Sequence, residues 1–326
     1  MVSGIPTPLR LTTGTAEVHD PGFSADGKRL FAALFPSQRG ELLARRPEDK
    51  GFSPWPEMPG LSAGHVSFSP DGTDVAYTSY PEMNLWRMKA DGSGRHQITF
   101  GSNQGYMPQW SPDGRRIAYM AAPGSTTKPA ESKISVLDTA SGGVREPVTW
   151  RESQQGVPTW TPDGNGLIFG ENDNVYPIRP TCSLHAFDFR TGQTRDLPGT
   201  TGLWTPRMCP SGLYVAAETR KQEELVLYDL RTGTVSELVR LPDSKLGDNP
   251  VWSRDGKYLY IDAPDAPAPA IYRIRISDRR CEPVVSLRGI QRANMGNWIG
   301  LTPSGAFLVT RRLEGSEIYA WDWLAP

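Results

Sequence analysis

The sequence predicts an all-β protein, a seven-bladed β-propeller built from four-stranded antiparallel blades. Three observations lead to this fold class. A five-residue turn motif recurs seven times, with its glycines 42 to 50 residues apart. Strand-like apolar segments follow the turns. With 33 glycines and 30 prolines in 326 residues, the chain is also much richer in turn-forming residues than an average protein.

The recurring motif predicts a tight hairpin turn in each repeat. The turn is counted from the serine or threonine, whose hydroxyl can bond the backbone. Proline, second, presets φ at about −65°, aspartate suits the third position, and glycine, fourth, takes the left-handed conformation. The aspartates of these turns are therefore predicted to be structural. The motif is weakened by departures at Ala25, Cys209, Ser211, Arg254 and Ser304. The seven copies are FSADG from Phe23, FSPDG from Phe68, WSPDG from Trp110, WTPDG from Trp160, MCPSG from Met208, WSRDG from Trp252 and LTPSG from Leu301.

Each copy supplies its strands in the same order. An innermost strand ends at the first residue of the motif, and a second strand follows the turn, as in Ile117 to Tyr119. A third strand comes next, as in Ile134 to Leu137, and a short fourth strand closes most repeats, as in Gln97 to Thr99. Four antiparallel strands per repeat form one propeller blade. The residues predicted to pack between blades are Trp110, Trp160 and Trp252.

The two ends of the chain predict how the ring closes. The last repeat has a third strand at about Ile318–Asp322 but no fourth, whereas Leu9–Thr12 resembles a fourth strand and precedes the first turn. Pairing these two segments would complete a seventh blade and leave no open sheet edge. We therefore expect residues 1–326 to form one propeller domain.

Composition argues against two classes of partner. A net charge of −1 gives no basic field for nucleic acid, and even the longest strictly apolar stretches, such as Ile117 to Ala122, are too short to span a bilayer. The three cysteines, Cys182, Cys209 and Cys281, are odd in number and scattered, so no disulfide framework is predicted.

The repeat resembles the PD40 (WD40-like, TolB-type) propeller repeat of bacteria over essentially the whole chain. Segments such as Val75 to Glu82, Trp252 to Lys257 and Glu317 to Pro326 are similar to the C-terminal propeller of acidobacterial sensor-regulator proteins. In that family a winged-helix domain and a transmembrane helix precede the propeller. The resemblance implies a sensor or scaffold module cut from a larger regulator, on the extracytoplasmic side of the membrane, or a cytoplasmic protein if no such regulator is involved.

The candidate binding site is one mouth of the central channel, where loops enter the innermost strands. Trp204 and Trp298 fall outside the inter-blade register and could stack on a ligand, and Arg311 could hold an anion. The candidate ligand-binding residues are His19, His65, Tyr80, Gln104, Tyr106, Trp204, Arg207, Asp248, Asn294, Trp298 and Arg311.

Three functions remain open on this sequence. The favoured hypothesis is a non-catalytic propeller that binds a small molecule, a glycan or a protein segment, with no cofactor or metal. The second is a lyase or hydrolase of carbohydrate or peptide, in which His19, His65 and nearby carboxylates would form the active centre. The third is a protein-docking module like TolB. No GxSxG nucleophile elbow is found in the sequence.

Overall fold

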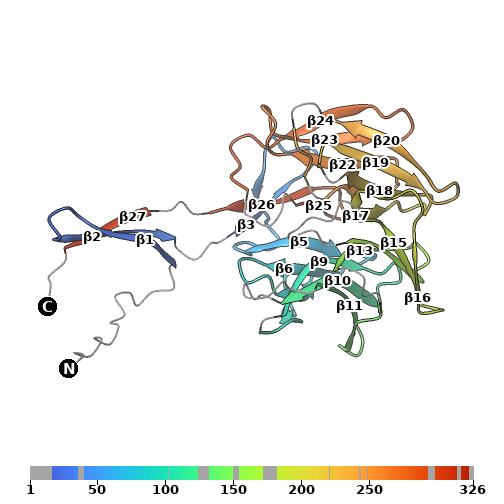
Figure 1. The fold of residues 1–326 in the computed structure, drawn as a ribbon, viewed down its shortest axis with the longest axis horizontal. Coiled ribbons are helices and arrows are strands. Elements are labelled where there is room, and N and C mark those ends of the chain that lie inside the picture. Colours follow the sequence, from blue (N-terminus) through green and yellow to red (C-terminus); the bar gives the residue numbers. More distant parts are fainter. Residues whose placement is uncertain are drawn as a thin grey trace, which may run out of the picture. The chain divides into compact units, whose positions relative to one another are not determined.

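The computed structural model describes residues 17–35, 40–101, 103–123, 132–149, 154–171, 182–219, 221–241, 244–247, 249–292, 298–313 and 317–322. They divide into two compact units, each described by itself: Gly40–Arg312, and Met1–Arg39 together with Leu313–Pro326. Strands, turns and loops make up these ranges (Figure 1). None of the described residues belongs to a helix long and apolar enough to cross a membrane.

The larger unit contains six four-stranded antiparallel sheets. Blade 1 consists of β5 (Ala63–Phe68), β6 (Asp74–Ser79), β7 (Leu85–Lys89) and β8 (His96–Gln97), and blade 2 of β9 (Asn103–Trp110), β10 (Arg116–Pro123), β11 (Lys133–Asp138) and β12 (Val144–Arg145). Blade 3 consists of β13 (Gln155–Trp160), β14 (Gly166–Glu171), β15 (His185–Asp188) and β16 (Gln193–Asp196), and blade 4 of β17 (Leu203–Met208), β18 (Tyr214–Thr219), β19 (Glu224–Asp229) and β20 (Thr234–Arg240). Blade 5 consists of β21 (Val251–Trp252), β22 (Tyr258–Ala263), β23 (Ala270–Arg275) and β24 (Cys281–Ser286), and blade 6 of β25 (Ile299–Leu301), β26 (Phe307–Arg312), β3 (Gly40–Arg45) and β4 (Ser53–Pro54).

The predicted number of blades is therefore wrong, since the propeller has six blades and not seven. The reason is the order of strands in blade 6, where β26 pairs with β3 and two C-terminal strands join two N-terminal ones (Figure 1). The third and fourth strands of the first repeat thus complete the last repeat. The predicted partner strand Leu9–Thr12 lies outside the described residues. The C-terminal strand β27 (Glu317–Asp322) pairs with β2 (Arg29–Phe35), where Tyr319 lies opposite Ala32.

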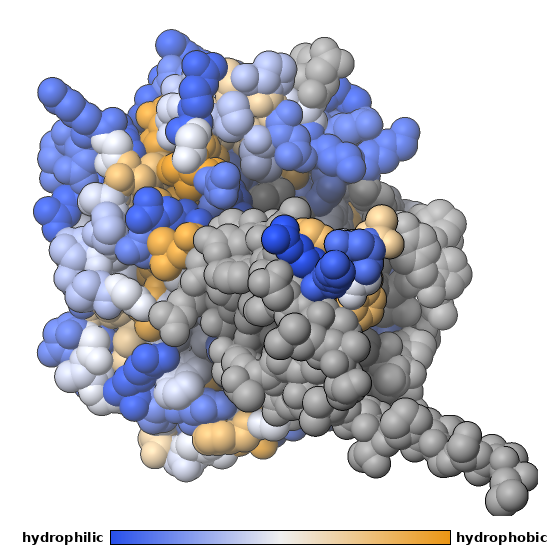
Figure 2. All heavy atoms as spheres, turned by 90° about the vertical axis from the view of Figure 1, so that its left-hand side faces the viewer, coloured by the Kyte–Doolittle hydropathy of each residue, from blue (hydrophilic) through white to orange (hydrophobic). Residues whose placement is uncertain are grey.

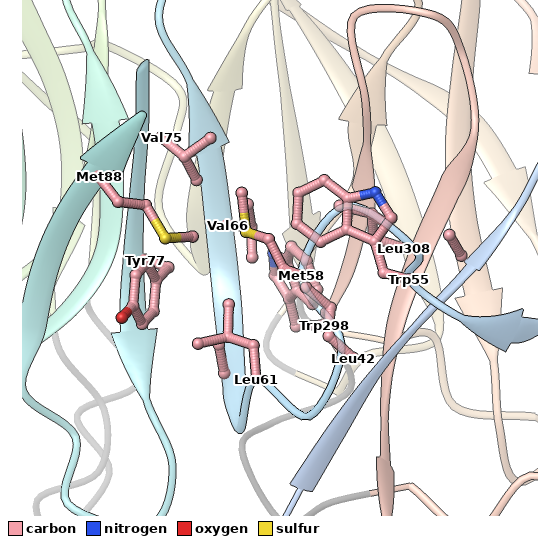
Figure 3. Packing of buried hydrophobic residues seen from close by; sticks show 12 residues of the cluster. Leu42, Trp55, Met58, Leu61, Val66, Val75, Tyr77, Met88, Trp298 and Leu308 are labelled. Atoms are coloured by element: carbon pink, nitrogen blue, oxygen red, sulfur yellow. The ribbon is translucent and has the colours of Figure 1, made fainter. Parts of the chain in front are cut away.

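The closure between blade 6 and blade 1 is tightly packed. Leu42 of β3 and Leu308 of β26 share one buried cluster with Val66 of β5 and Tyr77 of β6 (Figure 3). The Thr310 hydroxyl donates a hydrogen bond of 2.7 Å to the carbonyl of Ala63, 247 positions earlier in the chain. These contacts bury apolar surface and satisfy a buried polar group across the closure, so they stabilise the six-bladed ring.

The turn motif also connects neighbouring blades. Gly72 has a φ of 76°, and a Cβ added there would lie 3.2 Å from Pro303 in the turn of blade 6. The turn aspartates accept hydrogen bonds from within their own turns. The hydroxyl of Ser69 and the backbone N–H of Thr73 lower the pKa of Asp71 to about 2. The structural role predicted for these aspartates is confirmed.

The recurring tryptophans join one blade to the next, as the repeat predicts. In each case the indole N–H donates to a backbone carbonyl in the innermost strand of the preceding blade. Each bond links a side chain of one blade to the backbone of the preceding one, so it helps to fix the distance between blades. The pairs are Trp110 with Ser67 at 3.1 Å, Trp160 with Gln109 at 2.9 Å and Trp252 with Arg207 at 3.0 Å.

The smaller unit is a three-stranded sheet in the order β1 (Glu17–Phe23), β2, β27. It keeps the local features of a blade. The pairing of β1 with β2 shifts register between His19 and Gly22, and the Asp26 carboxylate accepts a hydrogen bond from the Ser24 hydroxyl in the following turn. The repeat therefore forms its local structure here too. That residues 1–326 form one domain stays a prediction, because each unit is described separately.

Candidate functional site

The innermost strands, which form the inner wall of the propeller, are interrupted by shifts in register. In blades 1 to 4 the innermost strand loses register with its neighbour at a point about seven residues before the turn glycine. His65, Met107 and Thr205 occupy this point with φ of 50°, 51° and 44°. A bulge of this kind re-aims a side chain away from the regular pleat. The residues at this repeat position in the six blades are His65, Met107, Val157, Thr205, Asn249 and Trp298.

The innermost strands of all six blades contribute to one cavity of about 450 Å³. It extends from the bulge level to the turns, where Pro70 and Pro303 line it. The lining residues at the bulge position are His65, Met107, Asn249 and Trp298, and those two positions further along are Ser67, Gln109, Thr159, Arg207, Val251 and Gly300. A concave space with apolar walls and a few placed polar groups is the usual form of a binding site.

Two aromatic rings flank the histidine of the cavity. His65 is only 4% exposed, and its ring centre lies 6.3 Å from that of Trp298 and 6.5 Å from that of Tyr106. The Trp298 ring lies over Gly300, where an added Cβ would come within 2.5 Å of the indole. A glycine is therefore required at this point of the innermost strand. Figure 3 shows Trp298 among the apolar side chains of the closure cluster.

Arg207 is a buried cation in the cavity wall, with 8% of its surface exposed. Its Nη2 donates to Oδ1 of Asn249 at 2.7 Å, and its Nη1 donates to the carbonyl of Pro206 at 3.0 Å. These two bonds hold the planar guanidinium in a fixed orientation. Asn249 belongs to the next blade, so the pair also spans a blade boundary.

Two buried carboxylates lie on second strands, outside the set of lining residues. Glu218 of β18 accepts a hydrogen bond of 3.2 Å from the Thr205 hydroxyl. Asp262 of β22 forms an ion pair of 2.8 Å with Arg292. Both side chains are fully buried. Each is held by a partner from a neighbouring segment.

Several predicted site residues have structural roles and do not line the cavity. Tyr80 is buried, and its backbone exchanges hydrogen bonds with Ser62. Trp204 donates its indole N–H to the carbonyl of Thr219 in its own blade. Arg311, predicted to hold an anion, donates from Nε to Glu41 at 2.7 Å, between β26 and β3 of blade 6.

The remaining predicted residues divide into a neighbouring pair and three that cannot be placed. Tyr106 donates its hydroxyl to the Gln104 side chain on β9, close to His65. Asp248 and Asn294 lie outside the described residues, as does the side chain of His19. Of the predicted site residues, those that line the cavity are His65, Arg207 and Trp298.

Sequence reasoning missed Met107, Gln109 and Thr159, which line the cavity. The missed signal is positional, because these residues stand seven or five places before a turn glycine. We find no group of three or more histidine, cysteine, aspartate or glutamate residues placed to hold a metal ion within the described part of the chain.

Comparison with known proteins supports the fold. No protein-family model matches the chain. TolB of Anaeromyxobacter dehalogenans is 34% identical over 93 residues, which cover 28% of this chain and 21% of that protein. Dipeptidyl-peptidase 5 of Porphyromonas gingivalis is 38% identical over 69 residues, covering 19% of this chain and 10% of the peptidase. The matches thus span about a fifth or less of these relatives.

Solved structures align over most of the chain. The putative TolB from Agrobacterium tumefaciens has a TM-score of 0.64 at 17% identity and covers 86% of this chain and 100% of that one. TolB from Acinetobacter baumannii gives 0.55 at 16% identity, with coverages of 91% and 79%. An oligogalacturonate lyase in complex with manganese gives 0.53 at 14% identity, with coverages of 86% and 78%. At these identities the likeness shows the fold alone, a TolB-like β-propeller.

Proposed function

We propose that this chain is a non-catalytic docking module whose central channel receives an extended segment of a partner protein. The observation that carries the proposal is the convergence of all six innermost strands on one cavity of about 450 Å³. Its walls combine the apolar side chains of Met107 and Trp298 with the polar ones of Gln109 and Thr159. Such a mixture suits a peptide, which presents both backbone polar groups and apolar side chains.

The rigidity of the wall also supports docking. The lining residues belong to or adjoin innermost strands, which are fixed to the next blade by bonds such as that from Trp160 to Gln109. A site held on packed strands loses little conformational entropy when a partner binds. The sequence similarity to TolB and the TolB structures agree with a protein-docking role.

Peptide display tests the proposal. A random peptide library is selected against the full chain, and the enriched peptides are measured against Gln109→Trp, which fills the cavity, and Val144→Trp, a matched change on the exposed outer strand of blade 2. We expect binding to be lost in the first variant and kept in the second. Enriched peptides that bind both variants equally would place the docking surface outside the channel and refute the proposal.

Two broader hypotheses stay predictions. A carbohydrate lyase would need His19 and His65 in one centre, and the side chain of His19 lies outside the described residues. The setting in a larger sensor-regulator, with the propeller on the extracytoplasmic side, rests on the family resemblance. A winged-helix domain and a transmembrane segment encoded in frame upstream of residue 1 would support that setting, and a different upstream gene would refute it.

A further inference from the structure

The channel cavity reaches one side of the turn face of the propeller. The turn face is the set of six turns between first and second strands, all of them described: residues 69–73, 111–115, 161–165, 209–213, 253–257 and 302–306. Pro70, Arg254 and Gly305 belong to these turns and line the cavity, whereas no turn residue of blades 2, 3 or 4 does. The cavity therefore meets the turn face at blades 1, 5 and 6.

Within this described ring of turns, neighbouring turns approach each other closely except between blades 5 and 6. At Gly305 an added Cβ would meet no described atom within 4 Å. Gly305 is also exposed, whereas the other five turn glycines are buried or half-buried. A gap thus separates the turns of blades 5 and 6. At the other five boundaries the added Cβ would lie 3.0 to 3.7 Å from the neighbouring proline, in the pairs Gly72 with Pro303, Gly114 with Pro70, Gly164 with Pro112, Gly212 with Pro162 and Gly256 with Pro210.

The sequence accounts for this gap. The second turn position is proline in five of the six turns, but in blade 5 it is Arg254, whose side chain is exposed. No proline ring is therefore present to pack against Gly305. The innermost strands are also shortest here, with two residues in β21 and three in β25. In blade 6 the first motif residue is Leu301, which cannot donate the inter-blade hydrogen bond that Trp160 makes in blade 3.

The same boundary is tightly packed at the second strands. The rings of Tyr260 on β22 and Phe307 on β26 lie edge to face, with their centres 5.0 Å apart. Ile271 of blade 5 and Val309 of blade 6 share one buried cluster. The two blades are therefore joined by their outer strands, and the gap is confined to the turn end of the innermost strands, beside the cavity.

Resting on the proposed docking function, we propose that the partner segment enters the channel through this gap, and that Arg254 keeps the entrance open. Hydrophilic side chains predominate on the described surface seen in Figure 2, whereas Met107 and Trp298 offer apolar contacts in the cavity. An extended segment suits an entrance between two adjacent turns. A strand needs about 4.8 Å in its narrow direction, against about 10 Å for a helix with its side chains.

A thiol placed inside the cavity measures entry directly. The reporter is Gln109→Cys in the cavity wall, and the probe is triglycine amide with an N-terminal maleimide, which alkylates thiols. Mass spectrometry of the digested protein separates labelling at position 109 from labelling at Cys281, which is half-buried. We expect Arg254→Trp to slow labelling at position 109 at least tenfold. Arg115→Trp, the same change on an exposed turn of blade 2, is the matched control and should leave the rate unchanged.

Arg254→Pro provides a second variant that should fold, because the Ser253 hydroxyl bonds to Asp255 here as in the proline-containing turns. It should slow labelling several-fold. Equal rates with and without the changes at Arg254, or equal slowing by Arg115→Trp, would overturn the entrance. Channel-dependent peptides from the display experiment would in that case still support docking by another route. No labelling at position 109 in any variant would show that the cavity is closed and would overturn both proposals.

Discussion

The inter-blade tryptophans allow a quantitative test through Trp160→Phe. The indole N–H of Trp160 bonds to the Gln109 carbonyl at 2.9 Å, and phenylalanine would leave that acceptor without its donor, at about 1–2 kcal/mol. The Arg116 guanidinium lies 4.6 Å from the same ring, and a smaller ring would weaken this cation–π contact by roughly 0.5 kcal/mol. The expected loss in the free energy of unfolding is about 2 kcal/mol.

Trp86→Phe is the matched control. Trp86 also carries an arginine over its ring, Arg95 at 4.5 Å, but its buried indole nitrogen has no hydrogen-bond acceptor among the residues that the structure describes. Removing that donor should cost less than about 1 kcal/mol. Both variants are unfolded in urea and followed by far-UV circular dichroism. Equal losses in the two variants would refute the claim that the indole-to-carbonyl bonds hold neighbouring blades together.

Three further predictions concern other contacts of the propeller. Gly300→Ala should displace the Trp298 ring, because the new methyl would lie 2.5 Å from it; tryptophan fluorescence should shift, and an unchanged spectrum would contradict the packing. Thr310→Val removes the 2.7 Å bond to Ala63 and should cost about 1–2 kcal/mol in urea unfolding, whereas no change would discount this closure contact. The Thr161 hydroxyl and the Asn165 N–H lower the pKa of Asp163 to about 2 in the folded state, from an ordinary value of 3.8, so its stabilisation is complete above pH 3.8 and is lost as pH falls to 2. Acid titration of Asp163→Asn should show a smaller loss of stability over that range, and identical acid profiles would disprove the turn's contribution.

The local structure could be predicted from the sequence because it depends on neighbouring residues. The turn motif specifies its own hydrogen bonds, as Asp71 shows with Ser69, and the tryptophan spacing predicts the inter-blade contacts. The blade count could not be read in this way. Counting repeats does not show which strand will pair with β26 as the third strand of its blade. Gly40–Arg45 and Glu317–Asp322 are both short strands with apolar centres, so the sequence of each suits this place. Which of the two pairs with β26 depends on contacts between segments far apart in the sequence, which the repeat pattern does not specify.

The candidate site was partly predictable for a related reason. His65 and Trp298 stand near the start of innermost strands or just before it, and reading those entries found them. Arg207 lies one position before the end of β17 and was included in the same reading. Residues inside the strands, such as Gln109 and Thr159, were missed because their orientation depends on the bulge. A bulge shifts which side chains point into the channel, and its effect is visible only when the strands are aligned with their neighbours.

Disulfide trapping tests the six-bladed closure most directly. Glu41 and Arg311 face each other in the pairing of β3 with β26, so Glu41→Cys combined with Arg311→Cys places two thiols across the closure. Tyr258→Cys with Arg275→Cys, a facing pair within blade 5, serves as the positive control. Six blades predict that mild oxidation links both pairs, seen as disulfide-joined peptides by mass spectrometry. A linked control pair with an unlinked 41–311 pair would contradict the closure and, with it, the channel described here.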